Sequence, residues 1–123
     1  TSDKEKVKAI HNYVISNFSY DYQKAKTITS DYLPDIDATY ASGKGICYDY
    51  SSLFAGMLRS VGIPAKLVKG YTSNISTYHA WNEVFIDGSW VVIDPSYDSQ
   101  MTRFGSTYNM EKPASQYSKV YEY

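Results

Sequence analysis

Three residues of this chain could together perform nucleophilic chemistry. Cys47 is the only cysteine, His79 is one of two histidines, and Asp94 stands directly before Pro95. Each has a simpler interpretation when taken alone. A lone thiol is often a small buried hydrophobic group, a histidine in a strand is often structural, and Asp-Pro often begins a turn. A catalytic role is favoured over these interpretations only if the surrounding helices and strands bring the three side chains together.

Cys47 is predicted to lie in the first turn of a helix. It follows the glycine-containing segment Ser42–Ile46, and Gly62 and Pro64 end the helical pattern after it. The apolar positions that recur with the helical period are Tyr50, Leu53, Phe54, Met57, Leu58 and Val61. Unpaired backbone N–H groups and the helix dipole favour negative charge at this end of a helix. They therefore favour the thiolate, which is the nucleophilic form of cysteine.

A β-hairpin is predicted to carry the histidine and the aspartate. The segments His79–Ile86 and Ser89–Asp94 alternate between apolar and polar residues. The dipeptide Asp87-Gly88 joins them, and Asp-Gly between two such segments is a strong signal for a two-residue hairpin loop.

This loop length fixes which residues face each other. It places Trp81 opposite Asp94, and His79 then shares that face and lies diagonal to Asp94. A three-residue loop would move Asp94 to the other face and would also separate Phe85 from Trp90. The hydrophobic pattern therefore favours the register that puts imidazole and carboxylate together.

These elements predict a Cys-His-Asp triad, provided that the His79 face of the hairpin packs over the start of the helix. His79 would take the thiol proton of Cys47, and Asp94 would orient the ring and stabilise the imidazolium. The thiolate would attack a carbonyl carbon and form a thioester, which water or an amine then resolves. The backbone N–H of Cys47 is the first expected donor to the oxyanion.

The remaining segments indicate an α+β domain. Residues 2–18 are predicted to be a helix, with Ser2 and Glu5 as a capping box, and Ile36–Ser42 a short helix that Gly43 ends. A strand is expected over Ala65–Tyr71. The region 19–46 is otherwise irregular, and the polar tail 97–123 offers at most an edge strand.

Composition excludes several classes of function. Hydrophobic residues make up 43% and charged residues 20% of the chain, which is typical of a soluble globular protein. The net charge of −1 provides no cationic surface for nucleic acid, and the chain contains no apolar run long enough to span a membrane. We expect one domain over residues 1–123, cut from a longer protein, because neither an initiator methionine nor a signal peptide is present.

Neither a metal site nor a cofactor is expected. A single cysteine can form neither an internal disulfide nor a thiolate cluster. The spacing of His11, Cys47 and His79 along the chain matches no known pattern of metal ligands. His11 is interpreted as structural, on or beside the apolar stripe of the first helix. Lys44 is interpreted as a solvated loop charge, with substrate steering as the alternative. The 14 tyrosines, with many serines and asparagines, are associated with an extracellular or cell-envelope location.

Several motifs, in this order along the chain, resemble the transglutaminase-like superfamily, in particular its bacterial-type cysteine protease and acyltransferase domains. They are GICYDYS at Gly45–Ser51, LRSVGIPA at Leu58–Ala65, Gly70-Tyr71, HAWNEV at His79–Val84 and WVVIDP at Trp90–Pro95. The resemblance implies a papain-like core in which a helix that begins with the cysteine packs on an antiparallel sheet. It assigns the catalytic roles to Cys47, His79 and Asp94, and it implies a second oxyanion donor from an aromatic residue upstream, either Tyr20 or Tyr22.

The predicted function is amide hydrolysis or acyl transfer on a protein, peptide or cell-wall substrate, and water and amine both stay open as acceptors. Trp81, otherwise a packing residue, and Tyr48 are candidates for the substrate pocket. Small size and the absence of a cation motif argue against a calcium-dependent animal-type crosslinker. Two alternatives remain. One is a catalytically silent binding module for a surface protein or glycan, and the other is an acyl-CoA-dependent N-acetyltransferase that uses the same triad. The sequence leaves the oligomeric state open.

Overall fold

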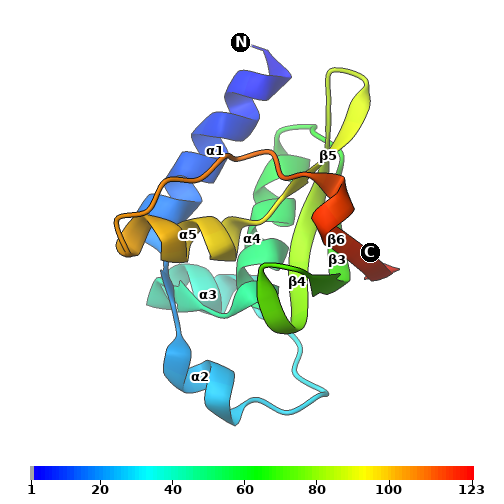
Figure 1. The fold of residues 1–123 in the computed structure, drawn as a ribbon. Helices are drawn as coiled ribbons and strands as arrows, with labels where there is room; N and C mark the ends of the chain where they lie inside the picture. Colours follow the sequence, from blue (N-terminus) through cyan, green and yellow to red (C-terminus); the bar gives the residue numbers. More distant parts are fainter. Residues whose placement is uncertain (1) are drawn as a thin grey trace.

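The computed structural model describes residues 2–123 and confirms the α+β class, with helices gathered beside a four-stranded antiparallel sheet (Figure 1). The strands of this sheet follow the order β5-β4-β3-β6, and β1 and β2 form a separate parallel pair. In chain order the elements are α1 (Asp3–Asn17), β1 (Ser19–Tyr20), α2 (Tyr22–Thr27), α3 (Ile36–Ser42), β2 (Lys44–Gly45), α4 (Cys47–Ser60), β3 (Ala65–Thr72), β4 (Ile75–Ile86), β5 (Ser89–Ile93), α5 (Pro95–Arg103), a 3₁₀ turn (Ala114–Gln116) and β6 (Tyr117–Glu122).

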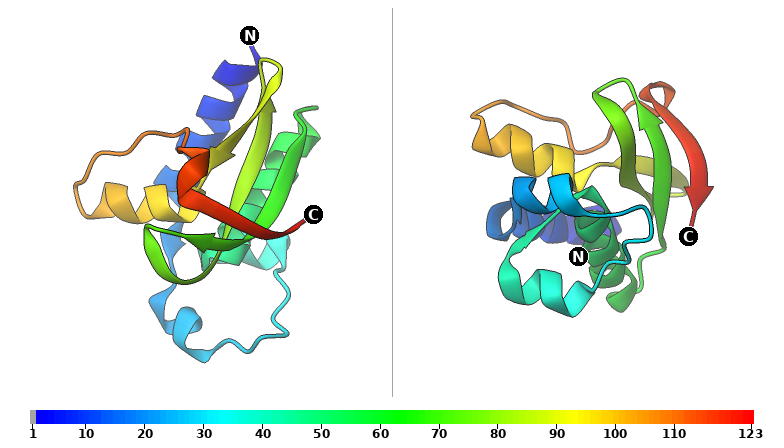
Figure 2. Two further views of the ribbon diagram at one scale, coloured as in Figure 1. Left: turned by 45° about the vertical axis from the view of Figure 1, so that its right-hand side comes forward. Right: turned by 90° about the horizontal axis from the view of Figure 1, so that it is seen from below.

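Helix α4 is the central element of the core. Its apolar stripe, with Tyr50, Phe54 and Leu58 almost fully buried, packs on β3 and β4, and α1, α3 and α5 surround its other sides (Figure 2). Gly62, at a φ of 83°, ends the helix where the sequence predicts. The helix that carries Cys47 is therefore held by the core along its length.

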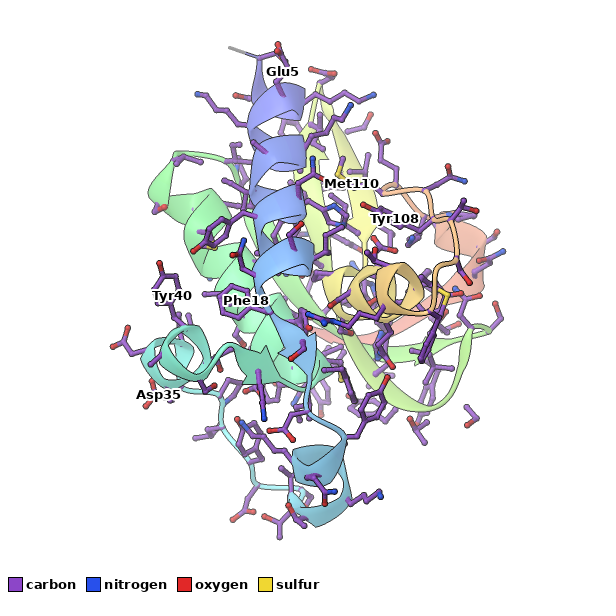
Figure 3. All side chains as sticks on the ribbon, turned by 90° about the vertical axis from the view of Figure 1, so that its left-hand side faces the viewer. Glu5, Phe18, Asp35, Tyr40, Tyr108 and Met110 are labelled. Atoms are coloured by element: carbon purple, nitrogen blue, oxygen red, sulfur yellow. The ribbon has the colours of Figure 1, made fainter. Side chains whose placement is uncertain are left out.

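The first helix begins and ends as predicted. Ser2 Oγ accepts from the backbone N–H of Glu5 at 3.1 Å, which confirms the capping box. At its other end Phe18 turns toward α3, where its ring lies 6.0 Å from that of Tyr40 (Figure 3). Gly43, at a φ of 70°, ends α3 as expected.

The hairpin has the predicted register. Ile86 pairs with Ser89 and Phe85 with Trp90, and both loop residues have positive φ, 51° at Asp87 and 84° at Gly88. Two successive positive φ values give a turn whose twist matches that of the strands, which is why Asp-Gly is favoured here. Strand β4 begins earlier than expected, at Ile75 rather than His79.

The two faces of the hairpin pack against different neighbours. Val84 and Ile86 belong to the main core with α4, whereas Trp81 belongs to a second cluster with Val68 and Val92. His79 is in phase with Trp81, so it does not lie over the body of α4. It lies near the start of the helix, where both His79 and Cys47 border one cavity.

Two helices were not predicted, for different reasons. Helix α2 has only six residues and no buried side chain, so it leaves no periodic pattern. Helix α5 buries polar rather than apolar side chains, because Ser99 Oγ donates to the Phe18 carbonyl oxygen and Asp98 binds His11. A search for apolar periodicity therefore misses it, although Asp94 and Pro95 form a normal helix start.

The tail does add an edge strand, β6, beside β3, and Gly70 makes this pairing possible. A Cβ atom on Gly70 would lie 2.1 Å from the Ser118 carbonyl oxygen and 2.9 Å from the Trp81 ring. Neither contact is tolerable, so the two strands can approach each other only because Gly70 has no side chain.

We expect Gly70→Ala to lower the free energy of unfolding by about 2 kcal/mol, because backbone must move to admit the methyl group. Urea denaturation gives the value, and amide hydrogen exchange should show the loss of protection concentrated in β6. Gly56→Ala in α4 is the matched control. Its Cβ would lie 3.3 Å from the end of the Ile36 side chain. It should change stability by less than about 1 kcal/mol, because alanine is the better helix former. Equal losses in both variants would contradict this account.

Candidate active site

The start of α4 is fixed by a buried carboxylate. Asp49 is inaccessible to solvent, and its Oδ2 accepts from the backbone N–H of Ile46 at 2.9 Å and from Lys24 Nζ at 3.0 Å. The hydroxyl of Tyr32 donates to Oδ1 of the same carboxylate. Asp49 therefore ties the first turn of α4 to α2 and to the loop that follows α2. No pattern in the sequence indicates this role of Asp49.

The short β1–β2 ladder places Tyr20 beside this helix start. Tyr20 pairs with Gly45, and the backbone N–H of Asp21 donates to the Gly45 carbonyl oxygen at 2.9 Å. Gly45 packs against Asp49 so closely that an added Cβ would lie 2.6 Å from the Asp49 Cβ. The glycine next to Ile46 is thus required by close packing of the backbone onto the first turn of the helix.

The imidazole of His79 binds the carboxylate of Asp94. His79 Nε2 lies 3.0 Å from Oδ1 and 2.8 Å from Oδ2 of Asp94. His79 is 4% exposed, Asp94 is fully buried, and the Trp81 ring stacks on the imidazole with centroids 6.2 Å apart. With Nε2 occupied, Nδ1 is the ring nitrogen left to serve Cys47.

The surroundings of His79 favour its charged form. Burial opposes protonation, but the Asp94 carboxylate, its hydrogen bonds and the interaction with Cys47 outweigh burial and raise the pKa of His79 to about 10. An imidazolium at neutral pH is suited to stabilise a thiolate next to it. The three side chains that the sequence singled out are therefore brought together.

The Asp94 carboxylate also binds groups outside the hairpin, which the sequence did not predict. The hydroxyl of Tyr117 donates to Oδ2 at 2.9 Å, and the backbone N–H of Tyr97 donates to Oδ1 at 3.3 Å, so Asp94 also caps α5. Burial and the nearby Asp94 carboxylate raise the pKa of Tyr117, which keeps its hydroxyl protonated. Tyr117 lies in the tail, where the sequence carries no strong signal for its position.

The two tyrosines considered as oxyanion donors are adjacent but differ in their surroundings. Burial, followed by the proximity of Cys47, raises the pKa of Tyr20 to about 12, so its phenol stays a donor beside the thiol. Tyr22 is 51% exposed, and its hydroxyl donates to Gln100 Oε1 at 3.1 Å. Tyr20 is thus held beside the start of α4 through its pairing with Gly45, whereas the Tyr22 hydroxyl is bound to α5.

A cavity of about 270 Å³ opens in front of the thiol. It is lined by Ile28, Thr29, Ser30, Tyr32, Ile46, Cys47, Tyr48, Lys69, Tyr78, His79 and Ala80. Tyr48 is in this wall, as the sequence suggested. Trp81 is not, because its ring is buried beneath His79 and against Tyr117, at 4.9 Å between centroids. Trp81 therefore packs against the imidazole and does not line the cavity.

The second histidine of the chain lies outside this cavity. His11 is buried and its Nε2 lies 2.9 Å from Asp98 Oδ2, a pairing between α1 and α5 that agrees with a structural role. In residues 2–123, no group of three or more His, Cys, Asp or Glu side chains is arranged to hold a metal ion. Over the same residues, no helix combines the length and the apolar character that crossing a membrane requires.

Comparison of the sequence with known proteins identifies the family that its motifs resemble. The sequence profile described as "Transglutaminase-like superfamily" matches residues 1–95. Protein YebA of Bacillus subtilis is 34% identical over 110 residues, which are 75% of this chain and 15% of YebA. The kyphoscoliosis peptidase of Mus musculus is 27% identical over 123 residues, with 88% of this chain and 18% of that protein covered. The chain thus spans less than a fifth of either relative.

Solved structures share the fold. A protein described as a TGase superposes with a TM-score of 0.67 at 26% identity, covering 93% of this chain and 30% of that one. Legionella pneumophila LapG superposes with a TM-score of 0.73 at 16% identity, covering 98% of this chain and 65% of the LapG chain. The periplasmic domain of TgpA from Pseudomonas aeruginosa superposes with a TM-score of 0.60 at 24% identity, covering 81% of this chain and 40% of that one. These likenesses agree in fold, and the profile match over residues 1–95 shows that the chain belongs to the transglutaminase-like superfamily.

Proposed function

We propose that this domain transfers acyl groups through a thioester on Cys47, acting on amide bonds of a protein, peptide or cell-wall substrate. The observation that carries the proposal is that the His79 ring, with Nε2 bound to buried Asp94, borders the same cavity as Cys47. Cys47, His79 and Asp94 are the proposed catalytic residues.

In the first half-reaction, Cys47 Sγ forms a bond to the carbonyl carbon and the C–N bond of the amide breaks. The leaving amine takes the proton that His79 held, so the imidazole becomes neutral. In the second half-reaction, water or an amine gives its proton to His79 and attacks the thioester, and the S–C bond breaks. The acceptor alone decides between hydrolysis and transamidation.

Asp94 acts on the ring rather than on the substrate. Because it is buried and bound to His79, Tyr117 and the Tyr97 amide, it can hold the imidazole in one orientation through both half-reactions. It also stabilises the positive charge that the ring carries when the thiol is ionised.

The oxyanion needs donors at the start of α4. The first backbone N–H groups of a helix lack intrahelical acceptors, so that of Cys47 is the first donor we assign. The phenol of Tyr20 is the second, because it lies beside the thiol and stays protonated.

The substrate class and location are also proposals. The mouse relative is a peptidase by name and one solved neighbour is a TGase, which agrees with amide chemistry on proteins. An extracellular or cell-envelope location agrees with the tyrosine-rich composition and with the periplasmic domain among the structural neighbours.

The function is tested by incubating the domain with a library of peptides and peptidoglycan fragments in ¹⁸O-water, with and without a primary amine. Mass spectrometry should detect ¹⁸O-labelled carboxylates for hydrolysis or an amine adduct for transamidation. Cys47→Ala should abolish both products and any labelling by acyl electrophiles, with an unchanged thermal unfolding curve, because the half-buried thiol contributes little to the core.

No product from any substrate with folded wild-type protein would instead identify a catalytically silent module. Product that persists in Cys47→Ala would refute the nucleophile assignment.

Removing the phenolic hydroxyl of Tyr20 tests the second oxyanion donor. We expect Tyr20→Phe to lower kcat about 10- to 100-fold while KM and stability change little, because the hydroxyl acts mainly in the transition state. Tyr22→Phe is the matched control, since that hydroxyl binds Gln100, and it should keep kcat within about twofold. Steady-state kinetics and urea denaturation provide both readouts. An unchanged kcat in Tyr20→Phe would remove Tyr20 from the site.

A further inference from the structure

The wall of the active-site cavity carries one cation besides the imidazole. Lys69, on β3, is half-buried, and its Nζ lies 3.9 Å from the centroid of the Tyr48 ring. Tyr48 follows Cys47 directly, and Lys69 pairs across the sheet with Ala80, the residue after His79. The ammonium group is thus tethered next to both halves of the proposed catalytic site.

Lys69 differs in its partners from five other lysines of the domain. Lys4, Lys24, Lys66, Lys112 and Lys119 each lie within ion-pair distance of a carboxylate. For Lys69, by contrast, no carboxylate of residues 2–123 lies within that distance, and no Asp or Glu is among the residues that line the cavity. The aromatic ring of Tyr48 covers one side of the ammonium and cannot neutralise its charge.

We propose that Lys69, positioned by Tyr48, forms a carboxylate-binding subsite of this cavity. The inference rests on the proposed function in one respect: the carboxylate then belongs to the substrate and lies near the scissile amide. A lysine ammonium offers three donors, and a partly enclosed cation without a protein counter-ion gains most from an anionic ligand. The same charge disfavours a cationic amine at this position.

The subsite is tested first without any turnover, by alkylating Cys47 with two reagents of similar size. Iodoacetate is anionic and iodoacetamide is neutral, and in both reactions an S–C bond forms while iodide leaves. We expect Lys69→Met to lower the ratio of the iodoacetate to the iodoacetamide rate constant about three- to tenfold. Lys69→Arg should retain the wild-type ratio within about twofold, because it keeps the charge.

Lys44→Met is the matched control. Lys44 is an exposed lysine close to Cys47 in sequence, and it is not among the residues that line the cavity. Its removal should leave the ratio unchanged. A ratio that is unaltered in Lys69→Met, or that falls equally in Lys44→Met, would overturn the subsite.

Paired peptides then identify the source of the carboxylate. One pair differs by Glu or Gln next to the scissile amide, and the other by a free or amidated C-terminus. The subsite predicts a kcat/KM preference for one acidic member that Lys69→Met abolishes. Turnover with no such preference would overturn the subsite and leave the proposed function intact. A shifted alkylation ratio without turnover of any peptide would support the subsite and contradict the proposed function.

Discussion

The bond between His79 and Asp94 is the interaction on which the rest of the site depends. His79 lies on the sheet face that points away from the body of α4, and its bond to Asp94 fixes the orientation of the imidazole. Asp94 is fixed because three separate elements bind it: β4 through His79, α5 through the Tyr97 amide and β6 through Tyr117. The Asp94 carboxylate and its hydrogen bonds to the ring outweigh burial and favour the charged imidazole.

The other half of the site is held independently, at the start of α4. There Asp49 binds the Ile46 amide, Lys24 and Tyr32, so the helix start, α2 and the cavity wall are joined through one buried carboxylate. The two halves meet because α4 packs on β3 and β4 along its length. The domain therefore places a thiol and an imidazole from distant parts of the chain by means of two buried aspartates and one shared core.

Local and periodic signals account for what the sequence could predict. Asp87-Gly88 specifies the hairpin register, because both positions require positive φ, and the apolar stripe after Cys47 specifies the helix. What the sequence could not supply depends on contacts between distant segments. The hydroxyl of Tyr117 comes from an edge strand whose position is set by Gly70, and α5 is stabilised by buried polar groups that leave no apolar pattern. The burial of Trp81 under His79 follows from the same edge strand, which covers a face that the hairpin alone would expose.

The protonation state of His79 tests the central claim most directly. Nitrogen-15 NMR of the imidazole, with the His79 signals assigned by their absence in His79→Gln, reports the charge of the ring across pH. A pKa raised to about 10 means that the charged form persists above the ordinary value of about 6.5 and is lost only as pH rises through about 10. The account predicts an imidazolium at pH 8 in the wild-type protein. A ring that is already neutral at pH 8 and titrates near 6.5 would contradict it.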